Sequence, residues 1–127
     1  MRLNHVTLIV SNLAASLRFY EQLGLRPIVL AEPRYARLVF PDGDETLSLE
    51  VTGEVAQPSR VQLYFECLDL DAVWARLERD GLRFEQPPTD MSYLWREARL
   101  RDPDGHQIRL YDAGVNRLNP PWRIDRS

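Results

Sequence analysis

Four polar side chains whose types can do chemistry stand on short segments in which apolar and polar residues alternate. They are His5, Glu50, Gln62 and Arg109. An imidazole and a carboxylate can move protons or hold a metal ion, whereas a guanidinium stays protonated and binds anions. Because successive side chains of a strand point to opposite faces, each of the four is expected on the face opposite its apolar neighbours.

Each candidate also has a plain structural interpretation. His5 can be a polar side chain at the start of an edge strand, and Glu50 can be a solvated carboxylate. Aromatic side chains can wall an organic ligand, but in strands they serve packing or subunit contacts at least as often. The aromatic candidates are Tyr64, Tyr93, Trp95, Tyr111 and Trp122. No strand-turn-helix signature of a nucleophilic serine is present, which argues against Ser-His-Asp catalysis.

These residues lie in an internal repeat. A shift of 57 positions aligns six identical residues between positions 13 and 26, and a shift of 62 aligns Pro41-Asp42-Gly43 with Pro103-Asp104-Gly105. The predicted halves are residues 1–53 and 58–112, and residues 113–127 form a C-terminal tail outside the repeat. The larger second shift places five extra residues in a Pro-containing loop expected at 85–93.

Each half is predicted to fold as β-α-β-β-β. An alternating strand leads through a polar cap to a helix that ends at Gly24 in the first half or Gly81 in the second. The predicted strands lie near residues 5–10, 26–30, 35–40 and 46–51, and near 61–67, 83–85, 96–101 and 107–111. One helix covers one face of a four-stranded sheet, so two copies are expected to form a curved, open mixed sheet of α+β class. A ligand cleft is expected between the repeats.

The repeat also indicates which candidates correspond. His5 aligns with Gln62 at the shift of 57. Glu50 is equated with Arg109 on the assumption that the turn after Pro41-Asp42-Gly43 is longer than its counterpart. With Tyr64 and Tyr111, these four residues form the predicted ligand site.

Composition restricts the function classes. The 127 residues suit one domain, and the 16 basic residues are all Arg, outnumbered by 19 acidic ones, giving a net charge of -3. This balance argues against nucleic acid as the partner. Cys67 is the only cysteine, which excludes an internal disulfide. No apolar stretch is long enough for a membrane span, so we expect a cytoplasmic protein without a membrane partner.

Four segments resemble the vicinal oxygen chelate (VOC) superfamily, which includes glyoxalases, bleomycin-resistance proteins and extradiol dioxygenases. They are His5–Leu13, Phe19–Leu25, Phe65–Asp71 and Asp102–Ile108. The resemblance covers about residues 1–112 and implies the tandem βαβββ fold. Superfamily members commonly dimerise, so it also implies a homodimer.

In the metal-dependent members of that family, the first and last strands of each half supply the ligands, usually His or Gln first and Glu last. His5 and Glu50 match two of these positions, and Gln62 stands where a second His is common. Arg109 stands where the second Glu is expected, and its guanidinium has no lone pair to offer a cation. The full four-ligand site is therefore excluded.

Two interpretations of the site remain, and the first is favoured. In it Glu50 and Arg109 pair in place of a metal, no cofactor is held, and a small organic ligand, which could be anionic, is bound as in bleomycin-resistance-like members. In the alternative, His5, Glu50 and Gln62 hold a divalent ion such as Zn, Ni, Mn, Co or Fe. The protein would then be a glyoxalase-type lyase or isomerase with Glu50 moving a proton. A third interpretation is a structural or regulatory dimer that binds no ligand.

Overall fold

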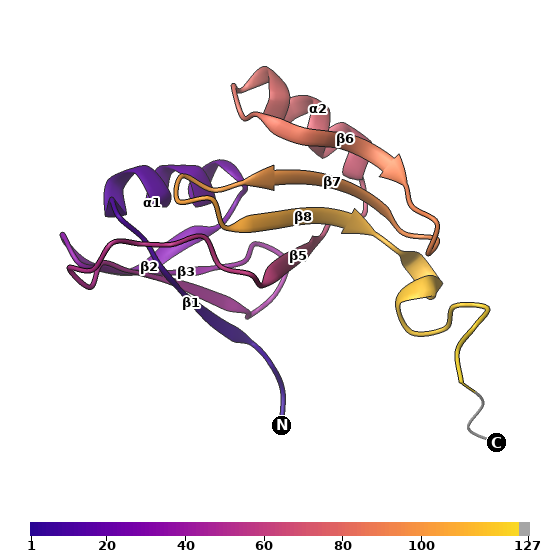
Figure 1. Ribbon diagram of the computed structural model, residues 1–127, viewed down its shortest axis with the longest axis horizontal. Helices are drawn as coiled ribbons and strands as arrows, with labels where there is room; N and C mark the ends of the chain where they lie inside the picture. The colour runs from indigo at the N-terminus through magenta and orange to yellow at the C-terminus, as the bar shows by residue number, and fades with distance from the viewer. Residues whose placement is uncertain (125–127) are drawn as a thin grey trace. The chain divides into compact units, whose positions relative to one another are not determined.

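The computed structural model describes residues 1–124, which divide into two compact units. Unit 1 holds residues 1–59 and 102–106, and unit 2 holds residues 60–101 and 107–124. Each unit contains one four-stranded mixed sheet and one ten-residue α-helix (Figure 1). This arrangement confirms the predicted tandem βαβββ architecture. The last three residues of the predicted tail lie outside the described residues.

Unit 1 contains the first repeat. Its elements are β1 (His5–Ile9), α1 (Leu13–Gln22), β2 (Arg26–Ala31), β3 (Tyr35–Val39) and β4 (Thr46–Glu50). The sheet order is β1-β4-β3-β2, with β1 parallel to β4 and the other neighbours antiparallel. The side chain of Asn12 caps α1 by accepting the backbone N–H of Ala15 at 3.0 Å. The helix ends before Gly24, whose φ of +105° favours glycine, as the sequence predicted.

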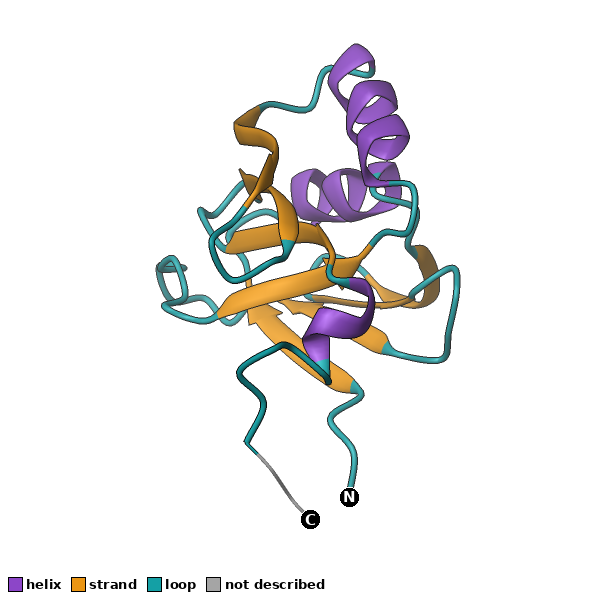
Figure 2. Cartoon of the chain, turned by 90° about the vertical axis from the view of Figure 1, so that its right-hand side faces the viewer, coloured by secondary structure: helices purple, strands orange, loops and turns teal. Residues whose placement is uncertain are grey.

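Unit 2 contains the second repeat and the start of the tail. Its elements are β5 (Gln62–Glu66), α2 (Leu70–Arg79), β6 (Phe84–Asp90), β7 (Arg96–Arg101), β8 (Gln107–Asp112) and the 3-10 helix η1 (Gly114–Arg117). The sheet order is β5-β8-β7-β6, again with one parallel pair, β5 with β8. Figure 2 shows η1 as a short helical turn after the last strand. Neither α1 nor α2 has the length and apolar character to cross a membrane, and the described chain has no other α-helix.

The loop predicted at residues 85–93 is wrong for most of its length, because β6 extends to Asp90. Two consecutive prolines, Pro87 and Pro88, favoured a loop. The sheet accommodates them because β6 is an edge strand and its pairing with β7 shifts register between Gln86 and Thr89. A proline at an edge or a bulge removes no essential hydrogen bond.

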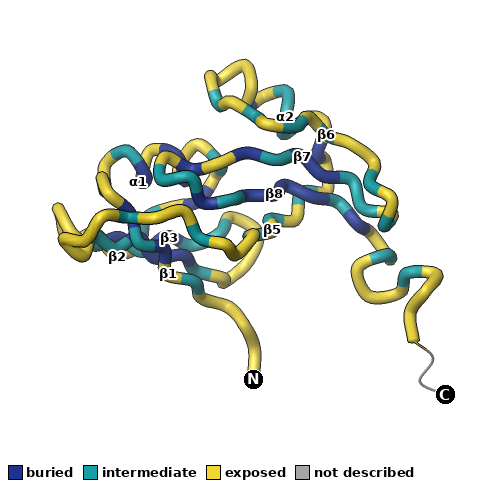
Figure 3. The backbone as a smooth tube through the Cα atoms, viewed as in Figure 1, coloured by how far each residue is buried: buried dark blue, intermediate teal, exposed yellow. Residues whose placement is uncertain are grey.

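The apolar residues of each sheet gather on the face that meets its helix. In unit 1 Leu47 and Leu49 of β4 are buried, and in unit 2 Leu100 and Ile108 are fully buried. Figure 3 shows buried residues along much of β8. Strand alternation then sends the intervening polar side chains to the opposite face of each sheet.

The turn between β7 and β8 belongs to unit 1 and forms a buried polar cluster there. The Asp102 carboxylate accepts the Tyr20 hydroxyl at 2.7 Å and the His106 backbone N–H at 2.9 Å. Nδ1 of the His106 ring accepts the Ser59 N–H at 3.0 Å, and Nε2 lies 2.8 Å from the Ile9 carbonyl. Both the Asp102 carboxylate and the His106 ring are thus hydrogen-bonded within unit 1.

Candidate functional site

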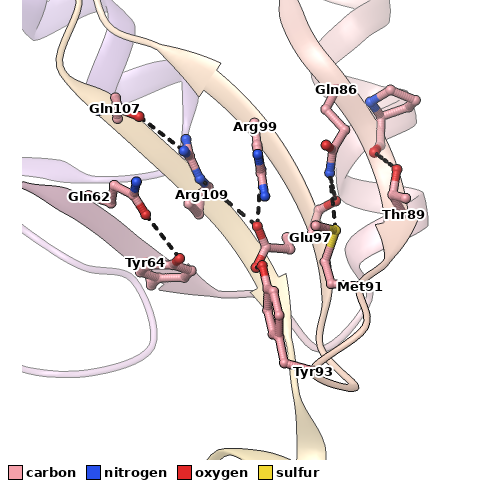
Figure 4. A network of polar contacts seen from close by, with 11 residues as sticks. Gln62, Tyr64, Gln86, Thr89, Met91, Tyr93, Glu97, Arg99, Gln107 and Arg109 are labelled. Carbon is pink, nitrogen blue, oxygen red and sulfur yellow. Dashed lines mark hydrogen bonds and ion pairs between the residues drawn. The ribbon is translucent and has the colours of Figure 1, made fainter.

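Polar and aromatic side chains occupy the face of the unit 2 sheet opposite α2, which we call the polar face of unit 2. Because Leu100 and Ile108 point to the helix side, residues of the other parity on the same strands point away from it. The residues of this face drawn in Figure 4 are Gln62 and Tyr64 of β5, Glu97 and Arg99 of β7, and Gln107 and Arg109 of β8. The face therefore draws on three adjacent strands.

A carboxylate, Glu97, lies at the centre of this face and is fully buried. It accepts the Tyr93 hydroxyl at 2.5 Å and Nε of Arg99 at 3.2 Å, and Nε of Arg109 lies 3.9 Å away. One anion thus faces two permanent cations, since arginine does not lose its proton in proteins. These three side chains together carry one excess positive charge. Figure 4 shows how they lie on the sheet.

Arg109 has hydrogen-bonding capacity that its surroundings do not use. Its side chain is only 7% exposed. Its Nη2 donates to the Gln107 side-chain oxygen at 3.0 Å, but its buried Nε–H has no hydrogen-bond acceptor among the described residues. Buried donors are nearly always partnered, so an orphaned guanidinium N–H calls for an explanation. An anionic group beside Arg109 would complete its donors and neutralise the excess charge.

The neighbouring tyrosine and arginine keep fixed protonation states. Burial, followed by the hydrogen bond to Glu97, raises the pKa of Tyr93, so that the phenol stays protonated as a donor. Burial opposes the charge of Arg99, but its interactions with Glu97 and Tyr93 outweigh burial and raise its pKa. Arg99 is 32% exposed, so the charged cluster is accessible at this side chain.

Four aromatic rings adjoin the charged cluster. Trp95 stacks on Tyr111 with ring centroids 4.9 Å apart and meets the edges of Tyr64 at 5.5 Å and Tyr93 at 5.9 Å. The indole N–H donates to the Asn116 carbonyl at 3.2 Å, which ties η1 to the rings. Tyr64 is 40% exposed, so part of this aromatic surface faces solvent. Rings beside guanidinium groups suit a ligand with a planar apolar part and an anionic end.

In unit 1, the face of the sheet opposite α1 carries a different polar arrangement, a chain of hydrogen bonds. Nε of Arg37 donates to the Tyr35 hydroxyl at 3.0 Å, and this hydroxyl lies 2.6 Å from Oγ of Ser48. Ser48 Oγ lies 3.2 Å from Nε2 of His5, whose Nδ1 lies 2.7 Å from Oγ1 of Thr46. The hydrogen bond from Ser48, followed by Arg37, lowers the pKa of Tyr35 despite partial burial and the nearby Glu50 carboxylate.

The sheet registers correct one equivalence expected from the sequence. In unit 1, Arg37 of β3 lies opposite Ser48 of β4, and in unit 2 Arg99 of β7 lies opposite Arg109 of β8. The shift of 62 that aligns the Pro-Asp-Gly turns also aligns Arg37 with Arg99, so Ser48 corresponds to Arg109. The β1–β4 and β5–β8 registers give the same alignment. The predicted equivalence of Glu50 with Arg109 is wrong.

Turn length explains the error. The equivalence required the turn after Pro41-Asp42-Gly43 to exceed its counterpart by three residues, whereas the registers require one. Glu50 therefore corresponds to Tyr111. It lies two residues beyond Ser48, the residue whose hydroxyl contacts His5.

The structure brings together some of the predicted site residues. Gln62, Tyr64, Arg109 and Tyr111 share the polar face of unit 2, where Tyr64 lies opposite Arg109 and donates to the Gln62 oxygen at 3.2 Å. Tyr64 also meets Tyr111 edge to face at 5.5 Å. His5 and Glu50 lie in unit 1, so their contribution to the same ligand site stays a prediction. The same is true of a Glu50–Arg109 pair, because within unit 2 Arg109 has Glu97 as its ion-pair partner.

Sequence reasoning missed Glu97, the residue around which the polar face is built. The signal was present, because Glu97 and Arg99 alternate with Ala98 and Leu100 on one strand. Parity alone places Glu97 and Arg99 on the face away from the helix. The sequence prediction takes site residues only from the first and last strands of each half, so it does not include this third strand.

The residues at the positions of the family's metal ligands do not fit a divalent ion. By the corrected equivalence these positions hold His5, Ser48, Gln62 and Arg109. Only His5 is a strong ligand, Ser48 and Gln62 offer neutral oxygens, and Arg109 brings a positive charge and no lone pair. Within residues 1–124, no three His, Cys, Asp or Glu side chains are grouped so that they could hold a metal ion. The donor set thus lacks any carboxylate at these positions.

Comparison with known proteins identifies relatives over most of the chain. The model of the Glyoxalase/Bleomycin resistance protein/Dioxygenase superfamily matches residues 2–110. The uncharacterized protein YraH of Bacillus subtilis (strain 168) is 29% identical over 126 residues, covering 87% of this chain and 98% of YraH.

Solved structures share the fold. A glyoxalase/bleomycin resistance protein/dioxygenase from Nocardioides superposes with a TM-score of 0.77 at 23% identity, covering 98% of this chain and 90% of that one. A lactoylglutathione lyase from Agrobacterium tumefaciens superposes with a TM-score of 0.72 at 17% identity, covering 87% and 92%. At these identities the likeness concerns the fold alone.

Proposed function

Because the chain belongs to the Glyoxalase/Bleomycin resistance protein/Dioxygenase superfamily, we propose that it uses this fold to bind a small organic anion without a tightly held metal. The ligand's anionic group binds Arg99 and Arg109 on the polar face of unit 2, and its apolar part packs against Tyr64 and Trp95. The observation that carries this proposal is the buried, unpartnered Nε–H of Arg109 in a cluster with one excess positive charge.

Charge and shape both favour an organic anion over a neutral ligand. A neutral ligand would leave the excess charge beside Glu97 uncompensated, whereas a carboxylate can accept two parallel N–H donors from a guanidinium. Inorganic phosphate would satisfy the guanidinium groups but has no apolar part to pack against the exposed surface of Tyr64. The combination therefore favours an arene or alkene carboxylate, held by charge at one end and by packing at the other.

The alternative function, a divalent-metal-dependent lyase or isomerase of glyoxalase type, needs ligands that this chain lacks. Arg109 would place a cation at a metal-ligand position, and Ser48 would replace a carboxylate. Sequestration of the bound molecule requires neither a metal nor a catalytic base. We therefore propose a binding role of the bleomycin-resistance type. The cytoplasmic location and the homodimer stay predictions from sequence and family.

An NMR titration tests the proposed function. Backbone ¹H–¹⁵N resonances of the full chain are followed during addition of benzoate, of benzyl alcohol as its neutral counterpart, and of inorganic phosphate. We expect saturable shifts at Tyr64, Trp95 and Arg99 with benzoate and weaker effects with the other two. Losing a charge-assisted hydrogen bond costs about 1.5–3 kcal/mol, so R99Q and R109Q should each weaken binding roughly 10- to 150-fold.

The matched control is R96Q. Arg96 lies on the same strand, but its parity puts it on the α2 side, where it pairs with Asp71 at 3.0 Å. We expect R96Q to bind benzoate as the unmodified protein does. Equal binding of benzoate and benzyl alcohol, or unchanged affinity in both R99Q and R109Q, would refute the proposed function.

A further inference from the structure

The charge balance around Glu97 limits how many negative charges a ligand can bring to the polar face of unit 2. Glu97 is fully buried, and its carboxylate lies 3.2 Å from Nε of Arg99 and 3.9 Å from Nε of Arg109, so the cations exceed the anion by one. Tyr93, which also contacts this carboxylate, is a neutral donor. One negative charge on a ligand therefore makes the cluster neutral, and a second would meet no uncompensated cation.

Exposed charged side chains flank this cluster, and they are balanced in sign. Arg101 of β7 pairs with Glu85 of β6 at 3.0 Å. Glu66 and Arg117 oppose each other at Tyr111: burial, followed by Glu66, raises the pKa of Tyr111, whereas Arg117 lowers it. All four charged side chains are exposed, so water and salt screen them. The uncompensated positive charge therefore belongs to the buried cluster.

We propose that the polar face of unit 2 selects its ligands by charge number, and that the ligand class is the aromatic monoanion, with Glu97 as the residue that rejects dianions. This inference rests on the binding role proposed above. To reach Arg109, whose side chain is only 7% exposed, an anionic group must leave water. Only one negative charge is compensated there, and removing an uncompensated charge from water is costly. A dianion should therefore bind more weakly than a monoanion of the same shape.

Two probes separate charge from shape. Phenyl sulfate and phenyl phosphate share an aromatic ring and a tetrahedral group of oxygens. Phenyl sulfate carries one negative charge throughout, whereas a phosphate monoester loses its second proton near about pH 6 and is a dianion at about pH 8. Both histidines of the chain lie in unit 1, so no imidazole of unit 2 changes its charge over this range. The comparison therefore reports the charge of the ligand.

Isothermal titration calorimetry of the full chain with both probes tests the proposal. We expect phenyl phosphate to bind at least about tenfold more weakly at about pH 8 than at about pH 5, and phenyl sulfate to bind equally at both. In E97Q the cluster holds two cations and no anion, so at about pH 8 phenyl phosphate should become the tighter ligand. Circular dichroism shows whether E97Q is folded under these conditions.

A second variant tests the same charge balance without changing a buried residue. Gln62 is exposed on the same face, where its side-chain oxygen accepts the Tyr64 hydroxyl. Q62R adds a cation there and leaves Glu97 in place. The second charge of a dianion then has a partner, so at about pH 8 the affinity for phenyl phosphate should rise at least about threefold relative to that for phenyl sulfate.

The control is E85Q, the same substitution at an exposed ion pair of the same sheet. Because solvent screens this pair, E85Q should change the ratio of the two affinities by less than about twofold. Equal binding of the two probes at about pH 8, or a ratio that neither E97Q nor Q62R changes, overturns the proposal while the proposed function stands. So does binding of benzoate without binding of phenyl sulfate, because shape then selects the ligand. If neither benzoate nor phenyl sulfate binds, the proposed function itself is wrong.

Discussion

Replacing Glu97 with glutamine should destabilise the fold more than a loss of one hydrogen bond would. Glu97 is fully buried, and Tyr93 and Arg99 donate to different oxygens of its carboxylate, so the single amide oxygen introduced by the substitution can keep only one of these hydrogen bonds. The substitution also removes the negative charge facing Arg109, whose side chain is only 7% exposed. At their separation of 3.9 Å the attraction is about 4 kcal/mol for an effective dielectric constant near 20.

Part of that energy is recovered. Arg99 is 32% exposed and can turn to solvent, so its contribution to the loss is small. Arg109 cannot leave its buried position as readily, and removing one member of a buried ion pair typically costs about 3–5 kcal/mol. We therefore expect E97Q to lower the free energy of unfolding by about 3 kcal/mol. For a chain of this length that corresponds to roughly 12 °C in Tm.

Urea unfolding followed by circular dichroism measures this change, with E85Q as the control. Glu85 makes an exposed ion pair with Arg101 on the same sheet, so the same substitution there should cost less than about 1 kcal/mol. E97Q should also bind benzoate more tightly, since the cluster then carries two uncompensated cations. If E97Q proves as stable as E85Q, the buried charge cluster does not stabilise the fold in this way. A parallel loss of stability and of anion affinity would contradict its assigned charge balance.

Three further results are expected. Burial, followed by Asp102, raises the pKa of Tyr20, whereas an unfolded tyrosine ionises near pH 10. Above about pH 10 the unfolded state therefore loses this proton while the folded state keeps it. The free energy of unfolding should then fall by about 1.4 kcal/mol per pH unit, and Y20F should remove this contribution to the pH dependence. The hydrogen bonds from Ser48 and then Arg37 lower the pKa of Tyr35, so as the pH is raised Tyr35 should give the first rise in phenolate absorbance. Y35F should abolish this rise, and R37Q should shift it to higher pH. If the rise is unchanged in Y35F, it does not come from Tyr35. After incubation with Zn, Ni, Mn, Co or Fe(II) and desalting, elemental mass spectrometry should find far less than one ion per chain; near-stoichiometric metal that is lost in H5A would contradict the metal-free site.

The sequence predicted the fold well because its signals are local and duplicated. Alternating strands, an Asn12 cap and the positive-φ position of Gly24 each report a local requirement of the backbone. The repeat then applied the same interpretation to the second half. The prediction failed at Pro87 and Pro88, where local residue preference favours a loop and only the place of β6 at the sheet edge permits a strand.

The candidate site was predicted less completely, for a different reason. Strand parity assigns Arg109 and Tyr64 to the correct face, but it does not say which side chain reaches which. The contact between Arg109 and Glu97 depends on the register between β7 and β8, and the register depends on turn length. A difference of two residues in the assumed turn was enough to equate Glu50, in place of Ser48, with Arg109.

The corrected register also shows how the two halves have diverged. The third strands keep an arginine at equivalent positions, Arg37 and Arg99, but its neighbours differ. In unit 1 the arginine donates to the Tyr35 hydroxyl, which lies beside the Ser48 hydroxyl. At the positions of Tyr35 and Ser48, unit 2 holds Glu97 and Arg109. In the metal-dependent members of the family a carboxylate ligand comes from the last strand of each half, whereas the corresponding positions here hold Ser48 and Arg109.

The polar face of unit 2 instead holds a charge cluster around the buried Glu97, in which the cations exceed the anion. In exposed ion pairs such as Arg101–Glu85 the two charges balance, and such pairs contribute little to stability. Burying Arg109 with an orphaned Nε–H lowers the stability of the free protein, and an anion that occupies this position would recover that energy on binding. An anion should therefore raise the Tm of the unmodified protein by more than it raises that of R109Q, which makes thermal shift a direct measure of the coupling between this buried charge and the ligand.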